Sequence, residues 1–225
     1  MKNPVLTIVM ILLTLSEISG QTLLQPTKKN SDFNIGMDIY STYIWRGTKY
    51  GRGPHFQPEM KFTTGGLTTG IWGSVDFNGY SEADPYISYS FPFGLSLGLT
   101  DYYYPDLPFF KTSPPDGSHA FEIKCNYING GFDLSANYIL NEAWGAGSEG
   151  GDIYFQIGYE FNRFNLFAGA GNGWHTTDGH FNICNLGLGT EERIEITEKF
   201  SLLLNGQIIF NPESEHLYFT VGLSF

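Results

Sequence analysis

The sequence has little charge, little cysteine and almost no helical periodicity. Charged residues make up 16% of the chain, against roughly 25% in ordinary soluble domains. After the first residues, no apolar run reaches the roughly 20 residues that a membrane-spanning helix needs, which excludes a helical membrane protein. Only 12 basic residues oppose 23 acidic ones, and the net charge of −11 argues against the basic footprint of a nucleic-acid-binding protein.

The 2 cysteines, Cys125 and Cys184, belong to no CxxC or Cys/His spacing. Two interpretations stay open for them. They are either two small apolar packing residues or a disulfide bridge in an exported chain. The sequence predicts no cofactor and no resident metal.

The chain opens with Lys2 and an apolar run over 5–15, which has the length of a signal-peptide core and is too short to cross a bilayer. We therefore expect a signal peptide over 1–20, a short periplasmic segment over 21–32 and one domain over 33–225. The alternative for the first residues is a buried strand or helix.

Period-2 alternation, by contrast, recurs along the whole chain. Ile153, Phe155 and Ile157 alternate with Tyr154 and Gln156, for example. Strands of this length suit a tilted crossing of a bilayer, which takes about 9–11 residues. The alternation predicts twelve strands, at about 33–44, 55–63, 67–77, 83–92, 95–104, 119–128, 132–140, 152–161, 164–173, 181–197, 200–210 and 217–225.

The connections between these strands alternate between long and short, with both chain ends on the short-turn side. That is the arrangement of an outer-membrane barrel, which has short periplasmic turns, longer extracellular loops and an even number of strands. The sequence therefore predicts an all-β fold, a closed antiparallel up-and-down transmembrane β-barrel of about twelve strands. The alternative is a soluble barrel with its apolar face inward.

Two features favour an apolar face that points outward. Aromatic residues gather towards strand ends, as in the girdles of membrane barrels: 43–45, 101–104, Trp72, Trp144 and Trp174. The polar face carries charges in mid-strand, which are expected to line a wet lumen. These predicted pore-lining residues are Asp38, Arg46, Glu59, Lys61, Asp76, Glu122, Lys124, Asp133, Glu160, Glu191, Arg193 and Glu195.

Arg46 lies at the rim on the predicted lumen face. It is expected to pair with Asp76 or Asp84 from neighbouring strands and hold the rim; the alternative is a role in selecting permeating anions. Because acids outnumber bases on the lumen face, the sequence predicts a mild cation preference.

Three stretches resemble one family in its own order and at similar spacing. They are "IYSTYIWRG" at 39–47, "GIWGSVDF" at 70–77 and "EADPYISYSFP" at 82–92. They resemble the TorF-type porin family of bacterial outer-membrane proteins. The resemblance covers about 33–104 and implies the fold and a bacterial outer-membrane location, whereas the family's transported substrate is not defined.

The last strand carries a second resemblance. Its alternating apolar residues look like the signal read by the barrel assembly machinery: Leu217, Phe219, Val221, Leu223 and Phe225. We expect this strand to close the barrel against the first one, with its apolar row facing outer-membrane lipid. The expected partners are thus lipid, the assembly machinery and small polar solutes.

Histidines offer a weaker signal for catalysis or metal binding. Ser118 and His119 are sequence neighbours on a strand, so their side chains point to opposite faces and do not form a nucleophile–base pair. His175, Asp178 and His180 are candidate ligands of a divalent metal, although Asp178–Gly179 is also ordinary turn chemistry. We expect no enzymatic activity.

The predicted function is a porin-like channel for passive diffusion of small polar solutes. The competing prediction is a barrel with a plugged lumen that binds a ligand or partner through its long loops at 105–118 and 141–151.

Overall fold

The structure is a computed structural model that describes residues 31–198 and 200–225. It has the following strands: β1 (Asp32–Tyr40), β2 (Tyr43–Trp45), β3 (Thr48–Tyr50), β4 (His55–Thr64), β5 (Leu67–Asp76), β6 (Ser81–Ser90), β7 (Leu95–Tyr103), β8 (His119–Asn129), β9 (Phe132–Ile139), β10 (Ile153–Phe161), β11 (Phe164–Gly171), β12 (Asn182–Thr197), β13 (Phe200–Asn211) and β14 (His216–Ser224). Two short 3₁₀ helices, η1 (Trp144–Ala146) and η2 (Gly173–His175), lie in the connections.

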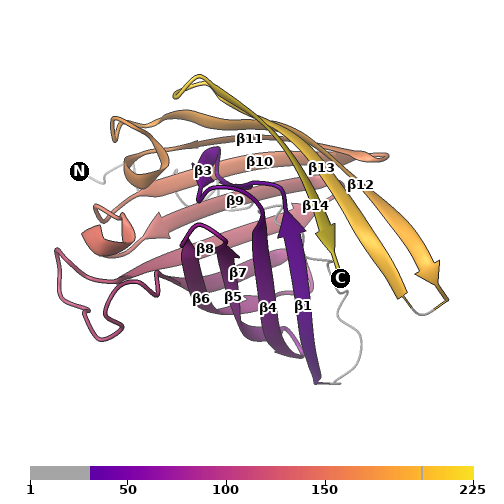
Figure 1. Cartoon of the computed structure of the whole chain (residues 1–225), viewed down its shortest axis with the longest axis horizontal. Helices are drawn as coiled ribbons and strands as arrows, with labels where there is room; N and C mark the ends of the chain where they lie inside the picture. Colours follow the sequence, from indigo (N-terminus) through magenta and orange to yellow (C-terminus); the bar gives the residue numbers. More distant parts are fainter. Residues whose placement is uncertain (1–30, 199) are drawn as a thin grey trace, which may run out of the picture.

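Twelve of the strands form one closed antiparallel barrel (Figure 1). Strands β4 to β14 pair in chain order, and β1 closes the ring between β14 and β4. Asp38 lies opposite Ser224 at the closing seam, and two backbone hydrogen bonds join Met37 to Phe225. The predicted up-and-down barrel and its closing strand are confirmed.

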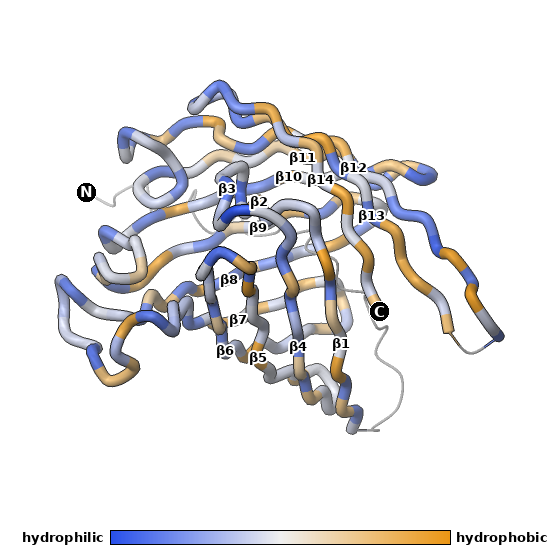
Figure 2. The backbone as a smooth tube through the Cα atoms, in the orientation of Figure 1, coloured by the Kyte–Doolittle hydropathy of each residue, from blue (hydrophilic) through white to orange (hydrophobic). Residues whose placement is uncertain are grey.

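The apolar faces of the strands point outward. On β10, Phe155, Ile157 and Tyr159 are 46%, 49% and 42% exposed, while the neighbouring Tyr154 on the opposite face is fully buried. Apolar and polar positions alternate along the strands in Figure 2. This distribution contradicts the alternative of a soluble barrel with inward apolar faces, because a water-soluble protein buries its apolar rows.

The four longest connections lie at one end of the barrel, as predicted, whereas 77–80 and 212–215 at the same end are no longer than the 91–94 turn opposite. We call this the long-loop end; its connections are 41–54, 77–80, 104–118, 140–152, 172–181 and 212–215. The opposite, short-turn end has the connections 65–66, 91–94, 130–131 and 162–163. Among the described residues, none of the helices has the length and apolar character needed to cross a membrane.

The first strand is shorter than predicted, because it ends at Tyr40 and the chain then forms the separate hairpin β2–β3. Trp45 pairs with Thr48, so Arg46 and Gly47 are the two turn residues, with φ of 51° and 83°. Positive φ at both central residues is typical of a type I′ turn, whose backbone twist matches the twist of the two paired strands. The sequence predicted an extracellular loop here, whereas the hairpin folds across the barrel interior.

The strands β12 and β13 extend past their neighbours at the short-turn end (Figure 1). The pairing of β12 with β11 stops at Thr190, whereas its pairing with β13 continues to Thr197. Residues further along β12 therefore leave the ring and form an overhang. The predicted signal peptide, and all but the end of the predicted periplasmic segment, lie outside the described residues.

Candidate functional site in the barrel lumen

An arginine clamp fixes the inward hairpin to the barrel wall. Arg46 Nη1 lies 2.6 Å from Glu122 Oε1, and Arg46 Nη2 lies 3.0 Å from Glu122 Oε2. Tyr102 donates a further hydrogen bond of 2.8 Å to Glu122. The side chains of Arg46 and Glu122 are only 4% and 1% exposed. A bidentate pair of this kind is the strongest geometry available to arginine.

Aromatic rings surround the clamp. The Arg46 guanidinium lies 4.5 Å from the ring centres of both Trp45 and Tyr154, within the range of a cation–π contact. Trp45 also packs against Trp174 and Tyr102, at ring distances of 5.0 and 5.3 Å. These contacts exclude water from the ion pair.

His175 completes the clamp from η2. Its Nε2 lies 3.4 Å from Arg46 Nη1, and because a guanidinium only donates, Nε2 must accept. Burial, reinforced by the Arg46 charge, lowers the pKa of His175 well below its ordinary value. The imidazole is therefore neutral in the folded protein at neutral pH.

The hairpin tip fits closely against the opposite wall. A Cβ on Gly47 would lie 1.9 Å from the backbone oxygen of Cys184, so only glycine fits here. Asn211 donates a hydrogen bond of 3.2 Å to the Gly47 carbonyl. The tip thus touches β8, β12 and β13 at once and spans the lumen.

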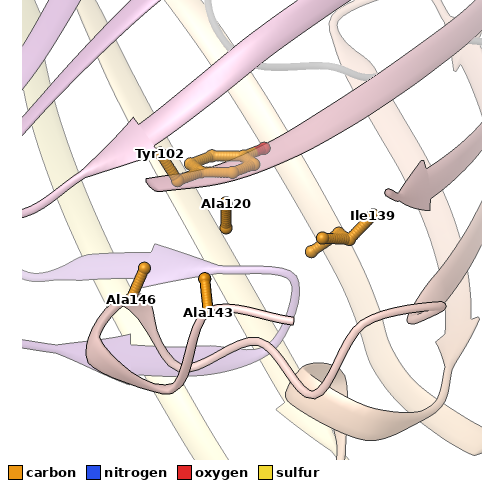
Figure 3. Packing of buried hydrophobic residues seen from close by; sticks show 5 residues of the cluster. All are labelled: Tyr102, Ala120, Ile139, Ala143 and Ala146. Atoms are coloured by element: carbon orange, nitrogen blue, oxygen red, sulfur yellow. The ribbon is translucent and has the colours of Figure 1, made fainter. Parts of the chain in front are cut away.

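Loop 140–152 packs against the barrel wall beside the hairpin. Ala143 and Ala146 pack with Tyr102, Ala120 and Ile139 in a buried apolar cluster, drawn in Figure 3. Trp45 of the hairpin and Trp174 also pack against this cluster, so the loop supports the hairpin from one side.

A second buried cluster lies beside the hairpin on β6. Glu82 and Asp84 are 5% and 4% exposed. Tyr80 donates a 2.6 Å hydrogen bond to Glu82, and the Tyr103 backbone N–H donates to Asp84 at 3.3 Å. Burial and the Glu82 charge raise the pKa of Tyr80, so its hydroxyl stays a donor.

The lumen is more accessible towards the short-turn end. Lys61 and Glu59 form an ion pair with side chains 26% and 15% exposed, and Tyr86 donates a 2.6 Å hydrogen bond to Glu59. Glu160 and Glu191 are exposed, on strand faces that alternate with outward apolar residues.

Most of the predicted pore-lining residues in mid-strand lie where the alternation placed them. Those on inward strand faces within the ring are Asp38, Glu59, Lys61, Lys124, Asp133 and Glu160. Glu191 continues the inward face of β12 at the edge of the ring, one residue past the last pair of β12 with β11.

Several predicted positions need correction. Arg46 pairs with Glu122, not with Asp76 or Asp84. Asp76 instead accepts hydrogen bonds from the backbone N–H groups of Arg52, Asn78 and Tyr80, because it ends β5 and caps the turn that follows. Arg193 and Glu195 lie on the overhang, outside the ring, because β12 has no partner there except β13.

The predicted aromatic girdle is also wrong for most of its members. Trp45, Tyr102 and Trp174 pack on one another inside the barrel, and Trp72 lies 5.6 Å from the buried ring of Tyr43. Trp144, which is 60% exposed, and Tyr103, on the outward face of β7 with Asp101, are exceptions. Tyr102 and Trp72 point inward because of their place in the strand alternation, whereas Trp45 and Trp174 are brought inside by the hairpin and by η2.

The other candidate residues do not converge on a reactive centre. His175 is buried at the clamp, whereas the side chains of Asp178 and His180 are 60% and 86% exposed. Ser118 donates to the Pro108 carbonyl, and His119 contacts Asp101. Among the described residues, no group of three or more acidic, histidine or cysteine side chains is placed to hold a metal ion.

Cys125 and Cys184 are both free and buried, which confirms the interpretation of the two cysteines as packing residues.

The apolar row from Leu217 to Phe225 lies on the outside of the barrel, with Leu217 and Phe219 each 69% exposed. The role of this row in assembly stays a prediction. The sequence analysis did not predict Glu82 as a lumen residue. Ala83 and Pro85 lie on the outward face of the strand, so the alternation places Glu82 on the inward face.

The comparisons with known proteins give no family. No family model and no curated protein matches the chain. A solved structure of a mutant Rh. blastica porin is 14% identical, with a TM-score of 0.39, over 76% of this chain and 55% of the porin. This chain thus spans about half the length of that porin.

Outer membrane phospholipase A is also similar in structure. An active-site mutant of the Escherichia coli protein is 12% identical, with a TM-score of 0.42, over 100% of this chain and 92% of that one. The Salmonella typhi phospholipase, a dimer with bound calcium, is 14% identical, with a TM-score of 0.41, over 90% and 93%. The barrel assignment depends on the closed strand order and not on these likenesses.

Proposed function

We propose that the chain is a bacterial outer-membrane barrel that conducts small polar solutes through a lumen gated by its inward hairpin. Two features support membrane placement. The apolar rows of the strands point outward, and the ring of strands is closed, which is the one arrangement of a sheet that is stable in lipid. The resemblance to the TorF-type porin family agrees with this placement. No covalent chemistry is part of the proposal.

The observation that carries the proposal is the contrast along the lumen. Glu59 and Lys61 keep water-accessible side chains, at 15% and 26% exposed, whereas the side chains of the clamp are almost completely buried. The lumen is thus polar and wet towards the short-turn end and closed at the long-loop end. Displacing the hairpin would join the two sides.

The charges on the inward faces give the expected selectivity. The acids there outnumber the bases Lys61 and Lys124; they are Asp38, Glu59, Asp133, Glu160 and, at the edge of the ring, Glu191. Rings of carboxylates favour cations in pores, so the open lumen should prefer cations mildly.

A second candidate function is a permanently plugged barrel that binds a ligand through its loops. A cavity of about 220 Å³ favours this candidate; it lies at the long-loop end between the hairpin and the loops 172–181 and 212–215. Lys49, Trp174 and Glu213 are among its lining residues. The two candidates differ in whether the hairpin ever leaves the lumen.

The test is solute flux into proteoliposomes that contain the wild-type barrel or the Glu122→Gln variant. Glu122→Gln removes the carboxylate charge opposite Arg46 at almost constant volume, so we expect the hairpin to release and solute entry to rise at least tenfold. Glu160→Gln, at the short-turn end, is the matched control and should leave the flux of an uncharged solute unchanged, because the hairpin still closes the lumen in this variant.

Folding must be verified for each protein by the gel shift between heated and unheated samples. A folded Glu122→Gln barrel with no more flux than the wild type would overturn the gated channel and support the plugged barrel.

A further inference from the structure

The hydrogen-bond ladder between β6 and β7 is incomplete. It runs from Ser90↔Ser96 to Tyr86↔Thr100 and stops there, although β6 continues back to Ser81 and β7 continues to Tyr103. Pro85 is the next residue of β6, and proline has no N–H to donate to the ladder. The backbone ladder is therefore interrupted in the half next to the long loops, where the Tyr103 N–H of β7 donates to the Asp84 side chain of β6 instead.

A groove of about 290 Å³ lies where the ladder stops. Pro85 and Ile87 of β6, Leu99 and Asp101 of β7 and Phe121 of β8 line it, together with Thr69 of β5. Ile87 and Leu99 are 46% and 38% exposed on the outward face. The groove is thus continuous with the apolar surface that faces lipid.

One end of the groove carries a polar pair. His119 Nδ1 lies 2.8 Å from Asp101 Oδ2, and His119 Nε2 lies 2.6 Å from the Phe109 carbonyl oxygen. A charged side chain on the lipid face is destabilising at the middle of the bilayer and is tolerated near the interface. The pair near the long-loop end of β7 therefore marks the level of the lipid head groups.

The opposite end of the groove is mainly apolar, since the Thr69 hydroxyl is bonded to the Tyr86 carbonyl. Thr69 pairs with Ile87, and Ile87 pairs with Leu99, so these three residues are neighbours across β5, β6 and β7, further from the long-loop end than Asp101. The groove thus runs from a polar head-group level into the apolar region. This is the orientation of a lipid in the leaflet that contacts the long-loop end.

We propose that this groove binds one lipid molecule from the surrounding membrane. An acyl chain lies along Leu99 and Ile87, and the head group donates an N–H or O–H hydrogen bond to Asp101. The Asp101 carboxylate has about four lone-pair positions, and the His119 ring nitrogen does not occupy all of them. The proposal depends on the membrane placement of the barrel and not on whether its lumen conducts.

The test is native mass spectrometry of barrels released from bilayers of phosphatidylethanolamine, which carries an N–H donor, or of phosphatidylcholine, which carries none. We expect one retained phosphatidylethanolamine per wild-type barrel and at least tenfold lower occupancy by phosphatidylcholine. Leu99→Trp fills the groove and should reduce retention of phosphatidylethanolamine at least tenfold.

Leu97→Trp is the matched control. Leu97 is 44% exposed on the same strand face and does not line the groove, so this variant should retain the lipid. Asp101→Asn, which keeps the shape of the side chain, should bring phosphatidylethanolamine retention down towards that of phosphatidylcholine. Equal retention by the two tryptophan variants, or equal retention of the two lipids by the wild type, would overturn the proposal.

Discussion

The two halves of the lumen are built from the same strands but in opposite ways. At the long-loop end, Arg46, Glu122 and His175 are almost fully buried and held by short hydrogen bonds and aromatic rings. At the short-turn end, Glu160 and Glu191 are exposed. Burial makes the first group sensitive to the loss of any partner, because no water is available there to solvate the charge that is left unpaired.

The largest expected effect comes from breaking the ion pair in the buried half. Glu122→Gln removes the counter-charge that holds Arg46 in the buried half, which should lower the free energy of unfolding by about 3–5 kcal/mol. Glu160→Gln should change it by less than about 0.5 kcal/mol. Urea titration of barrels folded in vesicles measures both. Similar losses in the two variants would mean that the two halves do not differ.

The close fit of the hairpin tip should give the next largest effect. Gly47→Ala places a Cβ 1.9 Å from the Cys184 carbonyl oxygen, whereas a Cβ on Gly79 meets nothing within 4 Å. Both glycines have positive φ, at 83° and 100°, so backbone strain is similar in the two alanine variants.

We therefore expect Gly47→Ala to be less stable than Gly79→Ala by about 1–3 kcal/mol, the usual cost of overpacking. Urea titration again measures the difference. If the two alanine variants unfold together, the hairpin tip is not tightly seated against β12.

A smaller effect should appear as a dependence on pH. The pKa of His175 is lowered in the folded barrel, so the unfolded chain binds a proton that the folded one excludes as the pH falls below about 6.5. Stability is therefore fully present above this pH and declines below it, by at most about 1.4 kcal/mol per pH unit for one proton.

His175→Asn should flatten this decline, while His180→Asn, at an exposed position, should leave it unchanged. Urea titrations at several values between about pH 8 and pH 5 measure the slope on either side of the ordinary histidine pKa. An unchanged slope in His175→Asn would show that another group carries the pH dependence.

The smallest effect should come from the exposed half. In a barrel whose hairpin is removed, Glu160→Gln with Glu191→Gln should lower the cation-to-anion permeability ratio by less than about tenfold, and Lys61→Gln should raise it. Reversal potentials in a salt gradient give the ratio. A ratio that does not respond to either change would place these charges outside the conduction path.

The sequence predicted the barrel because period-2 alternation and loop lengths are local properties. The alternation also predicts which side chains point inward. Trp72 lies on the opposite face from Ile71, and Tyr102 lies on the opposite face from Asp101, so alternation alone places Trp72 and Tyr102 inside the barrel. Their assignment to a membrane girdle put residue type before register. Parity is the stronger signal in a barrel.

The clamp was beyond local reasoning. The motif around Arg46 indicated a rim position, but the direction of the hairpin depends on Glu122 and His175, which are distant in sequence. Several acids lie on the strands around Arg46, and nothing in the sequence identifies Glu122 among them as its partner. The overhang of β12 was hidden for a similar reason, since alternation continues past the point where β11 ends.

Single-channel conductance in a planar bilayer tests the central claim, that the inward hairpin closes the long-loop half of the lumen. The comparison is between the wild-type barrel and a variant in which residues 43–50 are replaced by a short glycine–serine linker. The account predicts rare, small openings for the wild type and a stable, cation-preferring conductance for the variant. A folded variant that stays as silent as the wild type would contradict it.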